Sequence, residues 1–326
     1  MSGSAGWVIK LGGSVLETLD ADFFAALRAL QARCPLVVVH GGGKAIDARL
    51  KAAGIEAVKK DGLRVTDAAT LAVVEAVLSG EVNGAVVRAL LRAGVKAWGV
   101  SGCDMGWLVA EPKDGGALGF VGRVTHVDPT PLDALVALGA VPVVSPIGFG
   151  EGAQAYNINA DEAAAAVAAA LGYGVVFVSD VPGILVSGAT IGAASAAAQA
   201  PAATDPSAGG GLSAESDPPA GSNPPVRPLS DGRFVLTAAA AEDVEALIRD
   251  GTLTGGMIPK ARAAAQAVFA GAPEAWITGG DAAALSALEP PGARRGEPGP
   301  GTFGTRIFSR TKEKEGALYD VHAAFR

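Results

Sequence analysis

The amino-acid sequence predicts an α/β fold in which helices cover both faces of a mainly parallel sheet. Short apolar runs of strand length alternate along the chain with longer stretches of helical periodicity, a pattern typical of parallel sheets. The chain has 326 residues, enough for one large domain or two moderate ones. Apolar residues make up 49% of it, so a sizeable core can form.

The expected strands are short, apolar and rich in β-branched residues, and we place them at 7–11, 36–40, 95–100, 141–145, 175–179 and 275–278. The expected helices lie between them, at 20–32, 44–53, 67–78, 83–93, 131–138, 161–171, 239–249 and 259–269. Ligands of such sheets collect at the carboxyl ends of the strands. The loops that follow the strands are therefore where function is sought.

Composition excludes several classes of function. The formal net charge is −7, which does not favour a nucleic-acid or anionic-membrane partner. Cys34 and Cys103 have no CxxC spacing and the three histidines are scattered, so neither a disulfide framework nor a metal site is expected. The chain shows no signal peptide and no convincing membrane span, and a reducing cytoplasm fits best.

The first expected strand contains a lysine, Lys10, followed closely by Gly12 and Gly13. A lysine within an apolar run is costly unless its ammonium group meets an anion or reaches water. Lys10 can therefore lie at a strand end with its ammonium in solvent, or it can point at a ligand's negative charge. In the second case the two glycines let backbone N–H groups approach the same anion.

A second glycine loop, Gly41-Gly42-Gly43-Lys44, joins the strand at 36–40 to a helix. Three glycines before a helix N-terminus form a nest of N–H groups that suits an anion. The loop matches neither GxGxxG nor GxxxxGK[ST], so a Rossmann dinucleotide site and a Walker A loop are not indicated.

Two segments carry candidate acceptor-binding residues. In "KKDGLRVTD", Arg64 can bind a carboxylate bidentately, although a solvated basic turn explains the segment equally well. In "AYNINADEA", Asn159 is a candidate helix cap, and Asp161 in the first turn suits the helix dipole. Asn157 is left without a structural role and is a candidate ligand for a carboxylate or an amide.

Two further loops lie towards the C-terminus. The strand at 175–179 ends in Ser179-Asp180 and then Pro182-Gly183, a candidate nucleotide loop. In "LTGGMIPKARAAA", Lys260 lies in the first turn of a helix, where the helix dipole disfavours a cation unless a phosphate docks there. Lys10, Lys260 and the glycines at 41–43 could together surround a phosphoryl group during transfer, which requires mainly positioning and charge neutralisation.

The segment 187–231 interrupts this pattern. It is rich in alanine, glycine, serine and proline and has almost no large apolar residue. Such a sequence buries too little surface to offset the entropy lost on ordering. We predict a disordered insertion or a long surface loop.

The ordered set of motifs resembles the N-acetylglutamate kinases of the amino acid kinase superfamily. The motifs are "IKLGGS", "VVVHGGGKAID", "GLRVTD", "VLSGEVN", "SGCD", "VPVVSPIG", "YNINAD", "FVSDVPGIL", "LIRDGTLTGGMIPK" and "GTRI". The resemblance implies a three-layer αβα sandwich, with an N-terminal lobe (1–172) for acetylglutamate and dimerisation and a C-terminal lobe (173–326) for ATP. Mg²⁺ would be held mainly by the nucleotide phosphates, with no metal site of the protein's own.

The resemblance also assigns residues. Lys10 and Lys260 would stabilise the transferring phosphoryl group, and Asp161 would organise the two lysines. Acetylglutamate would be held by Gly42, Gly43, Arg64 and Asn157. The nucleotide would be held by Gly12, Gly13, Ser179, Asp180, Val181, Pro182, Gly183, Ile184, Leu185, Gly256 and Met257.

Two other functions are open at this stage. Relatives that phosphorylate carrier-linked aminoadipate or glutamate share the fold but are expected to have a basic rim, and here only Lys59, Lys60 and Arg64 are available. A non-catalytic amino-acid-binding regulator would be expected to have lost one of the three catalytic candidates.

Arginine-inhibited family members carry an extra N-terminal helix, and only nine residues precede Lys10. We therefore expect an arginine-insensitive homodimer.

Overall fold

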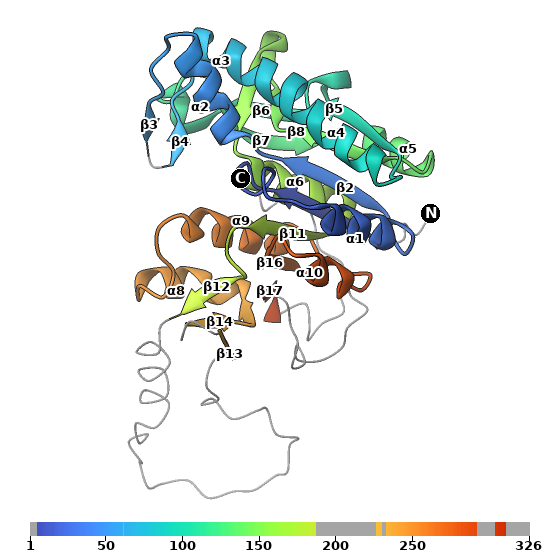
Figure 1. The fold of residues 1–326 in the computed structure, drawn as a ribbon. Coiled ribbons are helices and arrows are strands. Elements are labelled where there is room, and N and C mark those ends of the chain that lie inside the picture. Colours follow the sequence, from blue (N-terminus) through green and yellow to red (C-terminus); the bar gives the residue numbers. More distant parts are fainter. Residues whose placement is uncertain (1–4, 61, 187–225, 230–232, 292–303, 311–326) are drawn as a thin grey trace, which may run out of the picture.

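A central eight-stranded sheet organises the molecule in the computed structural model (Figure 1). The structure describes all residues except 1–4, 61, 187–225, 230–232, 292–303 and 311–326. In spatial order the strands are β15 (Ala238–Ala240), β17 (Thr305–Phe308), β16 (Ala275–Gly279), β11 (Gly174–Ser179), β1 (Trp7–Leu11), β2 (Leu36–His40), β8 (Val141–Ser145) and β5 (Ala97–Ser101). All neighbours pair in parallel except β16 and β17.

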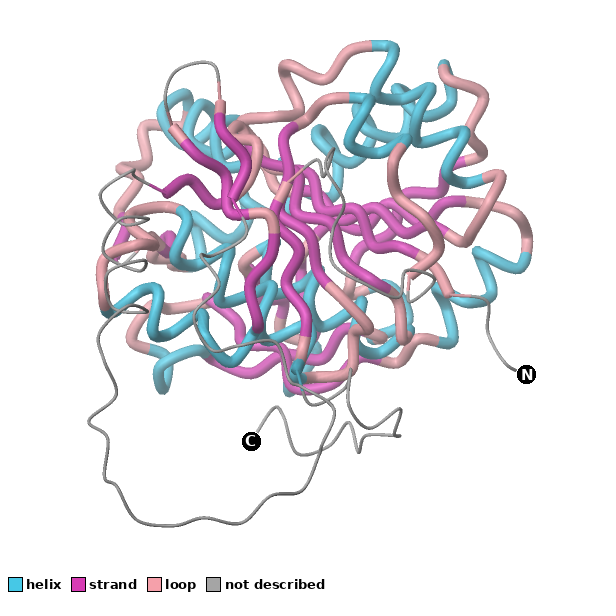
Figure 2. Tube along the Cα trace, turned by 90° about the horizontal axis from the view of Figure 1, so that it is seen from below, coloured by secondary structure: helices cyan, strands magenta, loops and turns pink. Residues whose placement is uncertain are grey.

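Helices cover both faces of this sheet, so the predicted three-layer α/β sandwich is confirmed (Figure 2). One face packs against α1 (Ala21–Gln31), α4 (Asn83–Arg92) and α10 (Ala282–Ser286). The other packs against α5 (Thr130–Ala137), α6 (Ala160–Leu171) and α9 (Met257–Phe269). Because side chains alternate along a strand, Lys10 lies on the same face of β1 as Val8, which packs on the α6 and α9 side.

All six predicted strands lie in this sheet, but the sequence did not predict the smaller elements. Four short strands close a small barrel: β6 (Leu108–Pro112), β7 (Val121–Val127), β9 (Ile147–Phe149) and β10 (Ala155–Ile158). A two-stranded hairpin, β3 (Lys59–Lys60) and β4 (Leu63–Arg64), lies after α2 (Gly43–Ala52). Single-turn 3₁₀ segments occur at Asp104–Gly106, Lys113–Gly116, Glu151–Ala153 and Ala241–Asp243. β3, β4, β9 and β10 are only two to four residues long, whereas β6 and β7 mix charged residues, glycine or proline with the apolar ones, so none of them contains a continuous apolar run.

The two helices predicted at 67–78 and 83–93 form one continuous helical run. It consists of α3 (Ala68–Glu75), a π-helical segment η1 (Ala76–Val82) and α4. The run is long and apolar enough, by length and composition alone, to cross a membrane, and 44% of its most apolar window is buried. Its apolar side chains, such as Val74, Leu78 and Leu90, pack in the core of the protein.

The C-terminal half corrects two predictions. A three-stranded antiparallel sheet contains β12 (Ile184–Val186), β14 (Phe234–Leu236) and β13 (Val226–Pro228). The prediction of disorder for 187–231 is wrong at residues 226–228, which form β13, where Val226 pairs with Leu236. Residues 187–225 and 230–232 of that segment lie outside the described residues. The helix predicted at 239–249 begins only at α8 (Val244–Arg249), since residues 238–240 pair with β17 instead.

Candidate active site

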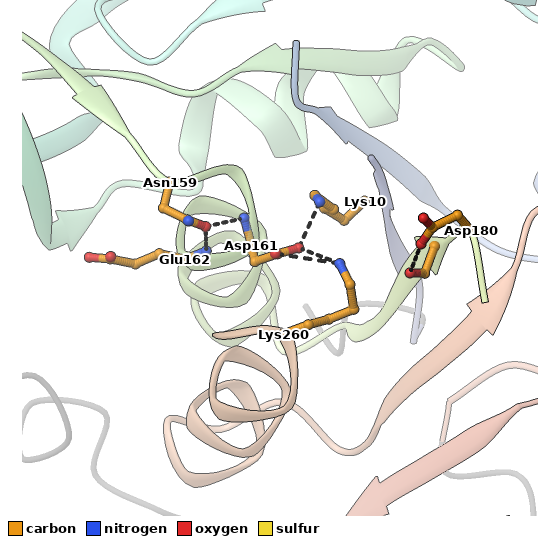
Figure 3. A network of polar contacts seen from close by, with 7 residues as sticks. Lys10, Asn159, Asp161, Glu162, Asp180 and Lys260 are labelled. Atoms are coloured by element: carbon orange, nitrogen blue, oxygen red, sulfur yellow. Dashed lines mark hydrogen bonds and ion pairs between the residues drawn. The ribbon is translucent and has the colours of Figure 1, made fainter. Parts of the chain in front are cut away.

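Lys10, Asp161 and Lys260 meet at the carboxyl edge of the central strands (Figure 3). The Lys10 Nζ lies 2.7 Å from the Asp161 Oδ1, and the Lys260 Nζ lies 3.3 Å from Oδ1 and 3.5 Å from Oδ2. The three residues come from β1, from the first turn of α6 and from the first turns of α9. Residues 250 positions apart in sequence thus form one charged cluster.

The N-terminus of α6 fixes the position of Asp161. The Asn159 side chain accepts hydrogen bonds from the backbone N–H groups of Asp161 (2.8 Å) and Glu162 (3.3 Å), as the predicted cap requires. The cap and the positive end of the helix dipole both favour a carboxylate at this position. Glu162 accepts a hydrogen bond from Lys113, which ties α6 to the barrel.

The cluster is buried, and it contains two positively charged side chains but only one negatively charged one. The side chains of Lys10, Asp161 and Lys260 are 7%, 14% and 12% exposed. Burial would raise the pKa of Asp161, but the two ammonium groups lower it below its usual value. The pKa of Lys260 is lowered first by burial and then by the charge of Lys10, and Asp161 offsets part of this. Two cations against one anion leave a surplus positive charge that an anionic ligand would neutralise.

A pocket of about 460 Å³ opens beside Lys10 and Lys260. It is lined by Lys10, Gly12, Gly13, Ser14, Val15, Val178, Ser179, Asp180, Val181, Leu185, Thr252, Leu253, Thr254, Gly256, Met257 and Lys260. Eight of the eleven residues predicted to bind nucleotide lie in this lining. Pro182, Gly183 and Ile184 do not: Ile184 is fully buried in β12, and its N–H donates to Thr305.

The two glycine loops approach each other closely. A Cβ atom built on Gly13 would lie 2.9 Å from the backbone nitrogen of Gly43 and 3.1 Å from that of Gly42. One built on Gly42 would lie 2.7 Å from the Leu78 side chain. A side chain on Gly13 would force the two loops apart, so glycine is needed there for close backbone approach, whereas one on Gly42 would press against Leu78.

Arg64 is buried next to the second glycine loop. It is 8% exposed; its Nη2 lies 2.6 Å from the Asp47 Oδ1 and donates a long hydrogen bond (3.4 Å) to the Gly43 carbonyl. The ion pair with Asp47 is not a well-directed hydrogen bond, because that oxygen has no hydrogen-bond partner among the described residues. The Arg64 Nη1 is also buried without one. A buried, incompletely paired guanidinium is suited to an anionic ligand.

Asn157 is linked to Arg64 through Thr66. The Asn157 side chain donates to the Thr66 hydroxyl (3.1 Å), which donates to the Arg64 carbonyl (2.7 Å). The structure therefore brings together Gly42, Gly43, Arg64 and Asn157, which lie far apart in the sequence. The predicted alternative of a solvated turn holds for Lys59 and Lys60, which are exposed, but not for Arg64.

Sequence reasoning missed several residues of this region. Asp47 carried no signal, because its contacts with Lys59 and Arg64 are made only by the tertiary fold. Thr66 is a candidate helix cap in the sequence, but Asp67 caps α3 instead, and the Thr66 hydroxyl bonds to Asn157 and Arg64. Ser14 and Val15 directly follow the predicted glycines, and Thr252 to Thr254 precede Gly256, so proximity to known motif residues could have found them. Among the described residues, no group of three or more His, Cys, Asp or Glu side chains is placed to hold a metal ion.

Comparison of the sequence with known proteins indicates one family of kinases. The family model "Amino acid kinase family" matches residues 6–193. Two curated proteins named acetylglutamate kinase, from Geobacillus thermodenitrificans and Geobacillus kaustophilus, are 40% and 42% identical over 275 residues. Each alignment covers 84% of this chain and 89% of the relative.

Solved structures show the same fold. A protein from Streptococcus mutans matches with a TM-score of 0.67 at 25% identity, over 93% of this chain and 98% of that one. A carbamate kinase from Giardia lamblia, bound to AMP-PNP, matches with a TM-score of 0.57 at 17% identity, over 94% and 99% of the two chains.

Proposed function

Since the chain belongs to the amino acid kinase family, we propose that it transfers the γ-phosphoryl group of ATP to the side-chain carboxylate of N-acetyl-L-glutamate. The reaction forms an acyl phosphate, N-acetyl-L-glutamyl 5-phosphate, in arginine biosynthesis. The close similarity to curated acetylglutamate kinases over most of the chain supports the acceptor. The observation that carries the chemistry is the buried pair of lysines around Asp161 beside the pocket.

The two lysines act on the phosphoryl group during transfer. A carboxylate oxygen of the acceptor forms a bond to the γ-phosphorus, while the bond to the β–γ bridging oxygen breaks and ADP leaves with that electron pair. Negative charge on the reacting oxygens is neutralised by Lys10 and Lys260. Asp161 keeps the two ammonium groups close together despite their repulsion.

The acceptor lies on the N-terminal side of this cluster. Backbone N–H groups of Gly42 and Gly43 approach its reacting carboxylate, whereas the guanidinium of Arg64 and the amide of Asn157 hold its other polar groups. The buried and incompletely paired guanidinium supports this role for Arg64, since a second carboxylate would complete its hydrogen bonds.

The nucleotide occupies the 460 Å³ pocket between the loop after β1, the loop after β11 and the start of α9. Gly12, Gly13 and Gly256 would let the backbone approach the phosphates, and Ser179, Asp180, Val181 and Leu185, which also line the pocket, would contact the nucleoside. Mg²⁺ would be bound mainly by the phosphates of ATP and would offset their charge.

We assign the acceptor and a dimer interface to the lobe at 1–172 and the nucleotide to the lobe at 173–326, in a cytoplasmic homodimer. The edge strand β5 and the adjacent α4 support the interface, because Trp98 is 57% and Leu91 53% exposed there. Large apolar side chains at a sheet edge are suited to a second copy. Light scattering of the wild type and of Trp98→Glu tests this assignment: a dimer that becomes a monomer supports it, and a monomeric wild type contradicts it.

A coupled assay of ADP release tests the reaction. With MgATP, we expect N-acetyl-L-glutamate to be used far better than glutamate, aspartate or aminoadipate. A preference for aminoadipate, or activity only on a carrier-linked acceptor, would favour the relatives that act on carrier proteins. Of the three basic residues expected to form such a rim, Lys59 is paired with Asp47 and Arg64 is buried, which leaves the exposed Lys60.

A further inference from the structure

His40 and Asn83 belong to the motifs "VVVHGGGKAID" and "VLSGEVN", and the sites described above give neither a role. His40 ends β2 and Asn83 begins α4. Their side chains meet behind the second glycine loop, with 3.1 Å between the His40 Nε2 and the Asn83 Nδ2. His40 is fully buried and Asn83 is 5% exposed.

The surrounding contacts fix which atoms donate. The Asn83 Nδ2 also donates to the Val143 carbonyl (2.8 Å), so the amide nitrogen and not its oxygen faces this side. Its second hydrogen then points at the His40 Nε2, which must accept. The proton of the neutral imidazole is therefore on Nδ1, which donates to the Gly41 carbonyl at 3.0 Å. Burial lowers the pKa of His40 to about 4, so this neutral form persists near pH 7.

The hydrogen bond to Gly41 determines where the next N–H points. In a planar trans peptide the carbonyl and the following N–H point in opposite directions. Because the Gly41 carbonyl is turned to the imidazole, the Gly42 N–H is turned away from it. The loop after β1 lies close to the Gly42 backbone nitrogen, since a Cβ built on Gly13 would be 3.1 Å from that atom.

Neighbouring elements hold Asn83 in place. Gly99 of β5 leaves room for its amide, because a Cβ there would lie 2.0 Å from the Asn83 Oδ1. The π-helical segment η1 immediately precedes Asn83, and its Leu78 and Val82 pack against Gly42. Segments of this kind occur frequently at functional sites. The glycine loop is thus supported from behind by β5, η1 and α4.

We propose that His40, held by Asn83, is a positioning residue for phosphoryl transfer, which fixes the Gly41 carbonyl so that the Gly42 N–H is aimed at the reacting group between the two glycine loops. The inference rests on the proposed function and adds to it a chain of three hydrogen bonds from β8 through α4 to the loop. A donor fixed in advance stabilises charge that develops in the transition state. Its loss should therefore lower kcat more than it raises KM for ATP.

Two substitutions of His40 separate positioning from packing. His40→Leu removes the Nδ1 donor, and we expect kcat to fall by roughly 10- to 100-fold, with KM for ATP changed less than about twofold. His40→Asn can place an amide N–H near the former Nδ1, and we expect it to recover most of this loss. Melting temperatures of both variants show whether each is folded.

A variant on another strand tests the same chain of contacts independently. Gly99→Ala forces the Asn83 amide to move, and we expect kcat to fall in the same direction as in His40→Leu. Ser79→Ala is the matched control, because it removes a hydrogen bond of η1 to Ser145 (2.9 Å) without touching His40. Its kcat should remain within about twofold of the wild type.

These experiments distinguish a failure of the proposed kinase function from a failure of the role proposed for His40. A wild type that does not phosphorylate acetylglutamate would contradict the proposed function itself. With an active wild type, unchanged kcat in a folded His40→Leu variant would overturn the inference, as would a folded His40→Asn variant as impaired as His40→Leu. If His40→Leu does not fold, unchanged kcat in Gly99→Ala would also overturn it.

Discussion

Two ion pairs of almost equal length lie in contrasting surroundings. Lys10 and Asp161 are 2.7 Å apart, with side chains 7% and 14% exposed, whereas Arg49 and Glu81 are 2.8 Å apart, with side chains 59% and 45% exposed. The surface pair has one charge of each sign in contact with water. The buried pair shares its carboxylate with Lys260 and has a surplus cation. Contact distance alone therefore does not distinguish the two pairs, whereas burial combined with a surplus charge makes the Lys10–Asp161 pair the candidate for function.

The largest expected effect is on turnover. Replacing Lys10 or Lys260 by Ala should lower kcat by roughly 10²- to 10³-fold, because each removes charge stabilisation from the transition state. Arg49→Ala should change kcat by less than about twofold and serves as the control. Steady-state assays with acetylglutamate and MgATP measure both. Near-normal turnover in the two lysine variants would remove the distinction between the buried and surface pairs.

His40 extends this comparison, because it is a buried titratable group that forms no ion pair with the residues the structure describes. Its folded-state pKa of about 4 lies below the ordinary value of 6.5, so the unfolded chain takes up the proton first as pH falls. Its contribution is fully present above pH 6.5 and is lost as pH falls to about 4. From this shift we expect a loss of about 3 kcal/mol in the free energy of unfolding.

Urea unfolding of the wild type and His40→Asn between pH 7 and pH 4 measures this loss. Carboxyl groups titrate in both proteins, so the difference between the two curves isolates His40. Parallel curves would show that the imidazole is not held neutral in the folded protein.

A smaller effect is expected at Arg64. Arg64→Lys retains the charge but loses the planar fork, so we expect KM for acetylglutamate to rise by roughly tenfold and KM for ATP to stay unchanged. Initial rates with each substrate varied in turn separate the two constants. A raised KM for ATP alone would assign Arg64 to the nucleotide.

The smallest effect is expected at the surface pair. Glu81→Gln should lower the free energy of unfolding by less than about 1 kcal/mol, and added salt should reduce the difference further. Thermal melting at low and moderate salt measures both quantities. A loss comparable to that of a buried pair would mean that exposure is a poor guide to the importance of ion pairs in this protein.

Local sequence was sufficient for six of the eight strands of the central sheet and for the loops that carry Lys10, Lys260 and the glycines. The sequence signal is a short apolar stretch next to a pair or trio of glycines, as in "VIKLGGS", "VVVHGGGK" and "LTGGMIPK". β9, β10, β15 and β17 are only three or four residues long, and β6 and β7 mix polar residues with the apolar ones. The roles of Asp47, Thr66 and Asn83 depend on partners 17 to 91 residues away, such as Arg64, Asn157 and His40. No local pattern contains such contacts.

The lysine cluster also shows a limit of local reasoning about charge. The first turn of α6 explains Asp161 as a dipole residue, and the Asn159 cap is as predicted. The tertiary fold then places two ammonium groups against the same carboxylate. Asp161 is therefore both a first-turn residue of α6 and the centre of the charged cluster, and only the tertiary structure reveals the second position.

Nucleotide affinity and the rate of transfer, compared in Lys260→Ala, show whether Lys260 acts on the transferring phosphoryl group or only binds ATP. Calorimetric titration with a non-hydrolysable ATP analogue and Mg²⁺ gives the affinity, and a single-turnover assay with acetylglutamate gives the rate. If Lys260 acts mainly on the transferring phosphoryl group, the rate should fall at least about tenfold more than the affinity. Equal losses in rate and affinity would contradict the account, because Lys260 would then only bind ATP.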